Sequence, residues 1–268
     1  MLTDLTIKSL GTNTDKSFWH KYTEAYDPIF GKIRAQNSSP CILEYGVFKG
    51  ESIQTYLDFF PQVEIHGVDI LPQRPEWPIA KNVKYYEVDQ SQRHQIKNFL
   101  INLDRRFDLV IEDGGHRPDQ QFNSLIETLP YMKKGSVYIL EDLHTSMKGH
   151  PLNKFFRLFG VKYPGNCYQI LLAIKHVHEL IELGKINANE ATNILISKFQ
   201  KSSLLGKPDI ISIYKKIREV QIYKRADLPI ECWQCRSHNF DYLKLKCENC
   251  GKDLMGIQES LTAILNMN

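Results

Sequence analysis

The chain has no uninterrupted apolar stretch of the roughly 18 residues that a membrane-spanning helix needs, so no membrane span is expected. Its N-terminal segment, MLTDLTIKSLGTNTDK, lacks the basic start and apolar centre of a secretory signal, which favours a cytoplasmic protein. The formal net charge is only +3, so charge by itself does not point to a polyanionic partner. Internal repeats and low-complexity segments are also missing from the sequence.

The composition is that of an ordinary globular protein. With 268 residues, of which 42% are hydrophobic and 24% charged, the chain can bury an adequate core and is expected to form one domain with an appendage. Four of its six cysteines lie close together near the C-terminus, and only Cys41 and Cys167 lie elsewhere. In a reducing compartment such a cluster favours a metal site over disulfides.

Short apolar runs alternate with helical patterns over the first half of the chain. Strands are expected at 41–45, 63–68, 83–88, 107–111 and 137–140. Helices are expected at 52–60, 92–103 and 118–132. Strands that alternate with helices predict a doubly wound, Rossmann-like parallel sheet of the α/β class.

Changes in pattern along the chain predict its domain organisation. Three parts are expected: a helical lead-in or lid at 1–38, a main domain at 39–228 with a helical insert at about 150–205, and a cysteine module with a tail at 229–268. Aromatic residues of the lead-in recur at a spacing of four, which places them on one helix face: Phe18, Tyr22, Tyr26 and Phe30. Residues 210–224 are expected to supply the last strands of the sheet, and the tail is a candidate helix.

Acidic side chains follow two apolar runs at the points where the expected strands end. The first run leads into Glu112, Asp113 and His116, and the second leads into Glu141 and Asp142. Ligands in open α/β sheets bind outside the carboxyl ends of the strands, so these groups are expected to converge. Crowded carboxylates need a cation among them, and Mg²⁺ suits an all-oxygen site, with the histidine placed as a general base. At one strand end alone, a helix cap is the simpler explanation.

A glycine-containing turn follows the first expected strand, with Gly46 and Gly50 preceded by Glu44 and followed by Ser52. Glycines let a backbone approach a ligand closely. The Gly-x-x-x-Gly spacing is not the dinucleotide fingerprint. A pyrophosphate would sit poorly near the glutamate, whereas an amino-bearing ligand would sit well. A plain tight turn remains the alternative for this loop alone.

Further acidic residues end the second and third expected strands. Asp69 stands where a carboxylate can accept hydrogen bonds from two ribose hydroxyls. Asp89 and Gln90 stand close to the place that an adenine would take. Each aspartate alone is more often a cap than a ligand, but the ordered series of strand ends predicts a site for an adenosine-type ligand.

This series resembles that of class I S-adenosylmethionine-dependent methyltransferases. More narrowly, it is similar to the metal-dependent sugar O-methyltransferases of macrolide and aminocoumarin biosynthesis, which are related to cephalosporin hydroxylase. The similarity covers about residues 11–146, with VQIYKR as a further candidate strand, and four stretches carry it: GTNTDKSFWHKYTEAYDPIF, LEYGVFKGES followed by HGVDI, IEDGGHRPDQQ, and YILEDLHTS.

The resemblance implies specific roles. S-adenosylmethionine would bind at Glu44, Gly46, Gly50, Ser52, Asp69, Asp89, Gln90 and Asp113. Mg²⁺ would be bound by Asp113, Glu141 and Asp142, and His116 would be the catalytic base. The region after Ser146 departs from the antibiotic-tailoring members, so it leaves the methyl acceptor open.

The cysteine module has the spacing of a zinc ribbon. Cys232 and Cys235 form one Cys-x-x-Cys pair, and Cys247 and Cys250 form the other after a gap of eleven residues. Four thiolates at such knuckles fit a closed, structural Zn²⁺ site. A redox pair or disulfides are the alternatives.

The sequence therefore predicts an S-adenosylmethionine- and Mg²⁺-dependent O-methyltransferase acting on a hydroxyl of a glycan or a glycosylated small molecule. One alternative is an RNA or ribonucleoprotein methyltransferase that docks through the ribbon and the basic segment 198–225, although that segment also fits a solvated helix face. The others are a non-catalytic zinc-ribbon binding protein on a methyltransferase fold and a hydroxylase related by fold. The oligomeric state is open, a homo-oligomer included.

Overall fold

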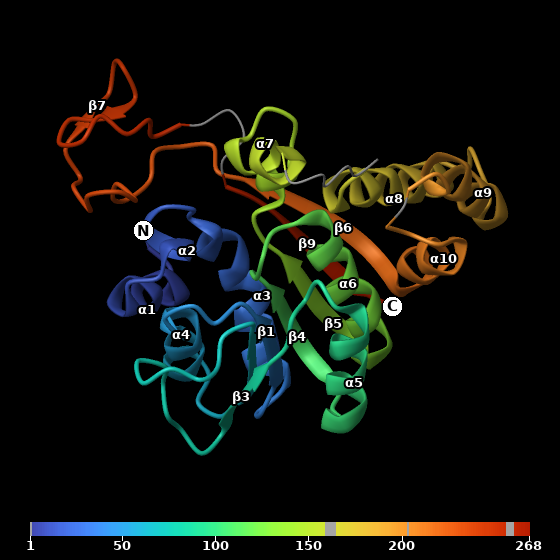
Figure 1. The fold of residues 1–268 in the computed structure, drawn as a ribbon, viewed down its shortest axis with the longest axis horizontal. Coiled ribbons are helices and arrows are strands. Elements are labelled where there is room, and N and C mark those ends of the chain that lie inside the picture. Colours follow the sequence, from blue (N-terminus) through green and yellow to red (C-terminus); the bar gives the residue numbers. More distant parts are fainter. Residues whose placement is uncertain (1, 159–164, 203, 256–259) are drawn as a thin grey trace.

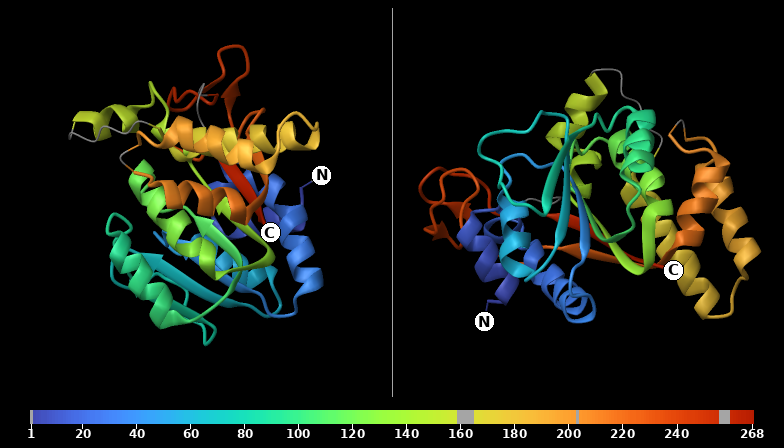
Figure 2. Two further views of the ribbon diagram at one scale, coloured as in Figure 1. Left: turned by 90° about the vertical axis from the view of Figure 1, so that its right-hand side faces the viewer. Right: turned by 90° about the horizontal axis from the view of Figure 1, so that it is seen from below.

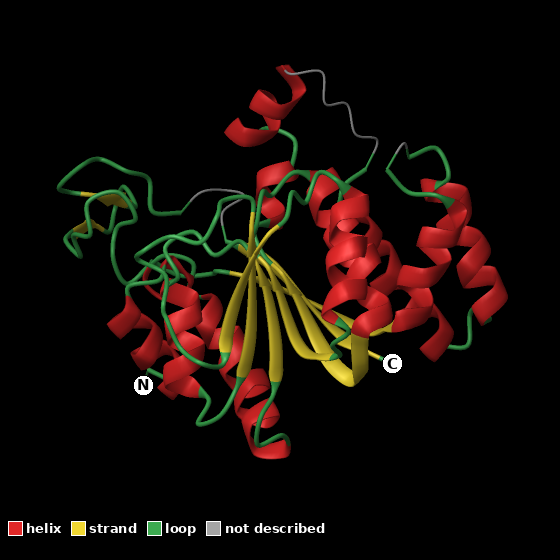
Figure 3. Cartoon of the chain, turned by 60° about the horizontal axis from the view of Figure 1, so that its bottom comes forward, coloured by secondary structure: helices red, strands yellow, loops and turns green. Residues whose placement is uncertain are grey.

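The computed structural model describes residues 2–158, 165–202, 204–255 and 260–268. Within them, seven strands form one sheet in the order β3-β2-β1-β4-β5-β9-β6. Their bounds are β1 (Cys41–Tyr45), β2 (Glu64–Asp69), β3 (Val83–Glu87), β4 (Phe107–Glu112), β5 (Met132–Leu140), β6 (Ile217–Lys224) and β9 (Leu261–Met267). The first five are parallel, and β9 is antiparallel to both of its neighbours. The predicted doubly wound α/β sheet is confirmed (Figure 1, Figure 3).

Helices cover both faces of the sheet (Figure 2). One face carries α1 (Asp4–Thr12), α3 (Tyr22–Gln36) and α4 (Glu51–Phe59). The other carries α5 (Arg93–Leu103), α6 (Pro118–Thr128), the 3₁₀ turn Leu129–Tyr131, and α8 (Cys167–Glu182) and α10 (Lys207–Lys216). Successive side chains of a strand point to opposite faces, so Ile42 packs in one core and Leu43 in the other. Burial on both faces explains why these strands are nearly continuous apolar runs.

The C-terminal tail corrects the prediction. The candidate helix at the end of the chain is instead β9, which pairs with β5 on one side and β6 on the other. Leu265 packs in one core and Ile264 in the other, so the segment is apolar on both faces. A short run of this kind has no periodicity that separates a strand from a helix. The predicted module 229–268 therefore includes a strand of the main sheet, and the ribbon is an insertion between two strands.

The expected last strands at 210–224 are also only partly correct. The first part of this segment belongs to helix α10, which begins at Lys207 and ends at Lys216, and only β6 is a strand. The predicted insert at about 150–205 contains α7 (Pro151–Leu158), α8 and α9 (Ala188–Phe199), in agreement with its helical pattern.

The aromatic stripe of the lead-in divides into two parts. Tyr22, Tyr26 and Phe30 lie on α3 and pack against the sheet. Phe18 lies instead on the short helix α2 (Asp15–Phe18), because the chain turns through a left-handed residue, Lys21, between the two helices. The prediction of one helix face is therefore wrong for Phe18.

Phe18 and Trp19 pack against the cysteine ribbon, which contains the short strands β7 (Phe240–Asp241) and β8 (Lys246–Cys247). The Phe18 carbonyl accepts hydrogen bonds from the backbone of Ile230 and Glu231. Arg225 stacks on the Trp19 ring and donates to the Trp19 and Leu254 carbonyls. The ribbon thus holds the α2 segment in place. No helix among the described residues has the length and apolar character to cross a membrane.

Candidate active site

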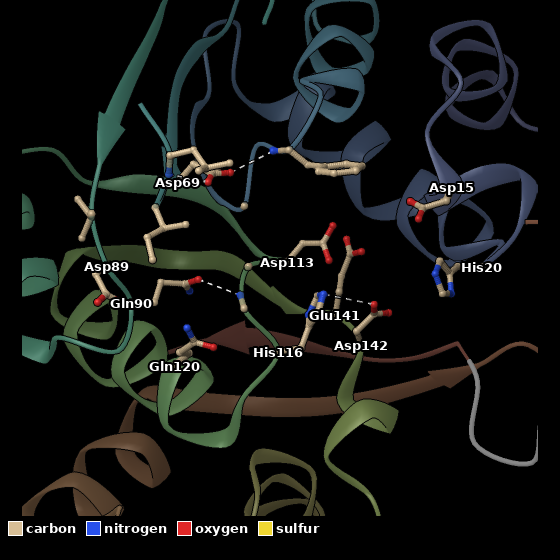
Figure 4. Close-up of a pocket in the computed structure, with 17 residues that line it drawn as sticks. Asp15, His20, Asp69, Asp89, Gln90, Asp113, His116, Gln120, Glu141 and Asp142 are labelled. Atoms are coloured by element: carbon tan, nitrogen blue, oxygen red, sulfur yellow. Dashed lines mark hydrogen bonds and ion pairs between the residues drawn. The ribbon is translucent and has the colours of Figure 1, made fainter. Parts of the chain in front are cut away.

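A cavity of about 390 Å³ lies outside the carboxyl ends of the parallel strands (Figure 4). Its lining includes many of the predicted site residues: Gly46, Asp69, Asp89, Gln90, Asp113, His116, Glu141 and Asp142. The acidic cluster lies between Asp69 and Asp89 on one side and Asp15 and His20 on the other (Figure 4). The crevice expected at this edge of a doubly wound sheet is therefore present.

The glycine turn brings two strand ends into contact. Gly46 has a φ of +89°, and a Cβ atom there would collide with the backbone carbonyl of Asp113. Gly50, also left-handed, would place a Cβ against Pro78, and it does not line the cavity. Glycine is needed at both positions for backbone conformation and close packing.

Asp69 holds this turn from the end of β2. Its Oδ2 accepts hydrogen bonds from the backbone amides of Val47 at 2.8 Å and Phe48 at 3.1 Å, and Oδ1 accepts one from Leu71 at 3.0 Å. The carboxylate also lines the cavity. Ribose binding by Asp69 stays a prediction, and the structure adds a second task, the positioning of the turn.

Gln90, which follows β3, holds the turn at the end of β4 in a similar way. Its Oε1 accepts a hydrogen bond from the Gly115 amide at 3.1 Å, and its Nε2 donates to Glu112 at 2.8 Å. A side chain at Gly114 would collide with Gln90. A side chain at Gly115 would meet Gln120 instead, so the two glycines before His116 make room for two different glutamines. The neighbouring Asp89 lines the cavity beside Gln90.

Glu44 and Ser52 lie behind the cavity wall rather than in its lining. The Glu44 carboxyl group is fully buried and accepts hydrogen bonds from Ser52 Oγ at 2.8 Å and Tyr56 OH at 3.0 Å. Burial raises the pKa of Glu44 to about 7. In this structure both residues support the turn from behind, and direct donor binding by them stays a prediction.

Lys16 is the most important residue that sequence reasoning missed. Its side chain, on α2, is only 4% exposed, and Nζ donates to Asp113 Oδ2 and to Glu141 Oε2, the latter at 2.9 Å. Glu44 lies 3.9 Å away. Burial alone would lower the pKa of Lys16, but the carboxylates of Asp113 and Glu141 outweigh it and keep the group charged. The acidic cluster thus contains a cation of its own.

One signal in the sequence could have pointed to Lys16. A buried acidic cluster requires a counter-charge, and Lys16 lies in the stretch GTNTDKSFWHKY that carries the family resemblance. The same stretch supplies Asp15 and His20, which also line the cavity. His20 Nδ1 lies 2.9 Å from Ser260 Oγ, so the segment is tied to the start of β9.

A divalent cation still fits the cluster. Asp113, His116 and Asp142 each offer one ligand atom, and these atoms lie within 4.8 Å of one another. Glu141 Oε1 is buried without a hydrogen-bond partner, on a side chain that lines the cavity. Buried carboxylate oxygens without partners are costly, and a hard cation would satisfy them. The predicted ligands Asp113, Glu141 and Asp142 all line the cavity, but the group with metal-ligand spacing contains His116 in place of Glu141. Lys16 is hydrogen-bonded to both Asp113 and Glu141.

His116 faces this cluster. Its backbone is left-handed, with a φ of +57°, and Nε2 lies 3.7 Å from Asp142 Oδ2. Burial tends to lower the pKa of His116, but Asp142 and Asp113 outweigh it and raise that pKa. Asp142 in turn accepts a hydrogen bond from Tyr22 OH at 2.9 Å, which orients the carboxylate beside the imidazole.

The four cysteines of the ribbon also converge. The Sγ atoms of Cys232 and Cys250 are 3.6 Å apart, those of Cys235 and Cys247 are 3.4 Å apart, and all four cysteines are free. All four sulfurs lie within 4.8 Å of one another. Arg236 and Gly251, which follow the second cysteine of each pair, have positive φ values. This arrangement fits a tetrahedral, structural Zn²⁺ site.

One of the eight basic residues of the segment 198–225 is buried. Arg225 is buried between the α2 segment and the ribbon, whereas the other basic residues are exposed along α9, α10 and β6: Lys198, Lys201, Lys207, Lys215, Lys216, Arg218 and Lys224. The solvated face is the simpler explanation for them.

No family model matches the chain. The chain is similar to mycinamicin VI 2''-O-methyltransferase of Micromonospora griseorubida, with 30% identity over 139 residues, which are 48% of this chain and 33% of the relative. It is also similar to a rhamnosyl-tetracenomycin 3'-O-methyltransferase of Streptomyces olivaceus, with 27% identity over 48% of this chain and 33% of the relative. A third relative is demethylmacrocin O-methyltransferase of Streptomyces fradiae, with 28% identity over 47% of this chain and 33% of the relative. The chain thus spans about a third of the length of these curated relatives.

Among solved structures, the fold is similar to that of the MycE methyltransferase of the mycinamycin pathway, determined in complex with Mg, SAH and mycinamycin VI. The TM-score is 0.62 at 18% identity, and the match covers 99% of this chain and 54% of the other. The chain therefore has the fold of a class I methyltransferase, and over about half of its length its sequence is similar to those of sugar O-methyltransferases of antibiotic pathways.

Proposed function

We propose that the protein is an S-adenosylmethionine- and Mg²⁺-dependent O-methyltransferase that methylates a hydroxyl of a sugar or a glycosylated small molecule in the cytoplasm. One observation carries the proposal: a single cavity contains the glycine turn and Asp69 at one end and the acidic cluster with His116 in its middle. The mycinamicin relative is a 2''-O-methyltransferase, and the tetracenomycin relative acts on a rhamnosyl group by its name, which supports a sugar hydroxyl as acceptor.

The donor would lie along the strand ends. Asp69 would accept hydrogen bonds from its ribose, and Asp89 with Gln90 would border its adenine. Gly46 lines the cavity and lets the turn lie directly against the backbone of Asp113, so the donor would lie beside both strand ends. Ordered in this way, the methyl group would point toward the acidic cluster, and the alignment of donor and acceptor would supply much of the rate.

Asp113, Asp142 and Glu141 would hold Mg²⁺, which would supply the Lewis acidity that makes a neighbouring hydroxyl easier to deprotonate. His116 would take the proton of the acceptor hydroxyl. The acceptor oxygen then forms a bond to the methyl carbon as the carbon–sulfur bond breaks, and the electron pair stays on sulfur. Asp142, 3.7 Å from His116 Nε2, would stabilise the resulting imidazolium.

Lys16 has a defined part in this arrangement. Its ammonium neutralises one oxygen each of Asp113 and Glu141, which leaves fewer carboxylate charges to be balanced by a metal ion. Because Phe18 and Trp19 of the same segment pack against the ribbon, Lys16 also connects the acidic cluster to the ribbon.

The proposal is tested by calorimetric titration with S-adenosylhomocysteine, followed by methyl-transfer assays on methyl glycosides with and without EDTA. Binding in the micromolar range and Mg²⁺-dependent turnover are expected. Asp142→Asn should remove the metal-dependent turnover and leave donor affinity nearly unchanged. A wild-type protein that does not bind S-adenosylhomocysteine would contradict the proposal, and full turnover in EDTA would contradict its metal-dependent part.

A further inference from the structure

A second hollow, of about 330 Å³, lies between the glycine turn and the cysteine ribbon. Asp15 and Phe48 line both this hollow and the main cavity, so the two adjoin. Trp233 and Arg236 line it from the ribbon. Its volume lies at the lower end of the roughly 300–1,000 Å³ that small-molecule sites have. An extension of the cavity toward the ribbon is therefore large enough for part of a substrate.

Phe48 stands between the two hollows in an unusual conformation. Its side chain is 69% exposed, although its φ is +53°, a value that bulky residues rarely adopt. The backbone is held on both sides, because its amide donates to Asp69 and its carbonyl accepts a hydrogen bond of 2.8 Å from the buried Trp77. Strain of this kind persists where the surroundings enforce it, often at ligand sites. The fold thus keeps an apolar ring in water at the rim of the cavity.

Trp233 provides a second aromatic surface. Its side chain is 56% exposed, whereas the other two tryptophans, Trp19 and Trp77, are buried. It lies between Cys232 and Cys235, so the fold of the ribbon sets its position. Exposed aromatic rings on two walls of one hollow are typical of sites that bind ligands with an apolar face.

The lining of the hollow has no net formal charge. Two acidic residues, Asp15 and Glu51, are matched in number by two basic residues, Lys49 and Arg236. The lining therefore offers both hydrogen-bond donors and acceptors. A polyanion such as RNA would be attracted by an excess of positive charge, which this lining lacks. A neutral molecule with many hydroxyl groups matches it better, because hydroxyls both donate and accept.

We propose that this hollow binds a neutral sugar ring of the acceptor, with its apolar face against Phe48 and Trp233 and its hydroxyls toward the charged side chains. The proposal rests on the proposed function and adds that the ribbon supplies part of the acceptor site. In this view the ribbon has two roles: it holds α2 in place, and it presents Trp233 to the substrate.

Fluorine NMR on the zinc-loaded, full-length protein labelled with 5-fluorotryptophan tests this directly, because the chain has three tryptophans. Methyl α-L-rhamnoside, methyl α-L-fucoside, methyl α-D-glucoside and methyl β-D-galactoside are each titrated to millimolar concentration. At least one should shift the resonance that Trp233→Phe removes, while those of Trp19 and Trp77 stay in place. Phe48→Ala should weaken that binding by about tenfold.

The matched control is Leu243→Ala, on the same ribbon, because Leu243 is 97% exposed and does not line the hollow. It should leave glycoside binding unchanged. Binding of S-adenosylhomocysteine is measured on the same samples. If that ligand binds and no glycoside shifts Trp233, the sugar site is refuted and the proposed function stands. If a glycoside shifts the Trp233 resonance and S-adenosylhomocysteine does not bind, the proposed function is refuted and the sugar site stands. If only single-stranded RNA shifts the Trp233 resonance, in a salt-sensitive way, the sugar proposal is wrong and the hollow binds a nucleic acid.

Discussion

Lys16 Nζ lies 2.9 Å from Glu141 Oε2, inside the cluster of carboxylates where a metal ion is expected. The two residues are 125 positions apart in the sequence. Their contact joins the α2 segment to the end of β5 across the floor of the cavity. The counter-charge that the crowded carboxylates require is thus supplied in part by the protein itself.

Replacing Lys16 by methionine should show that the acidic cluster depends on the lysine for its counter-charge. The change leaves Asp113 and Glu141 buried without their counter-charge, and the loss of one partner of such a pair costs about 3–5 kcal/mol. In EDTA the variant should therefore unfold at a lower temperature than the wild type. Mg²⁺ should stabilise the variant more than the wild type, because the ion can take over the missing charge. Lys8→Met, on a partly exposed pair, is the control. An unchanged melting temperature would show that Lys16 is not the required cation.

His116→Ala should reduce turnover by about 10²–10⁴-fold, the usual contribution of a general base. Affinity for S-adenosylhomocysteine and the melting temperature should stay close to those of the wild type, since His116 lies in the acidic cluster and not beside Asp69 and Asp89. His176→Ala, at an exposed position on α8, is the control. Turnover within a few fold of the wild type would remove His116 from the role of base.

The ribbon should hold about one zinc per chain, because a shell of four cysteines binds a single ion. Elemental analysis of protein purified without added metal measures this. Cys247→Ser should release the zinc and also weaken S-adenosylhomocysteine binding, because the ribbon holds Phe18 and Trp19 and thereby the cavity residues on α2. Tyr242→Ala, on the ribbon surface, should change neither. Zinc loss with unaltered donor affinity would show that ribbon and cavity are independent.

The contribution of His66 to stability should be lost as the pH drops below about 6.5, the ordinary pKa of histidine. Burial lowers the pKa of His66, so this group is neutral in the folded state and takes up a proton on unfolding. Its contribution is fully present above the unfolded pKa and is lost as the pH falls through the folded one. His66→Gln should remove this loss from the curve of unfolding free energy against pH below about 6.5, measured by urea denaturation. The same slope in both proteins would place the pH dependence elsewhere.

Local sequence patterns were sufficient where the chemistry is local. The apolar runs that end in Asp69, Asp113 and Asp142 predicted the strands and the edge of the sheet at which the cavity lies, because a parallel strand buried on both faces must be apolar throughout. The glycine turn and the two Cys-x-x-Cys pairs could also be predicted, since both depend on spacing within a few residues. The strand at the end of the chain could not be predicted, because a short apolar run has no periodicity that separates a strand from a helix.

The sequence by itself determined the alternation of strands and helices over residues 41–140, the acidic strand ends and the cysteine spacing, because each is encoded by residues close together in the chain. Only the tertiary structure decided that β9 returns from the ribbon to lie between β5 and β6, that Lys16 enters the acidic cluster, and that Trp233 lines a hollow beside Phe48. These relationships join residues far apart in the sequence. They follow from the packing of whole elements against one another, which no local pattern records.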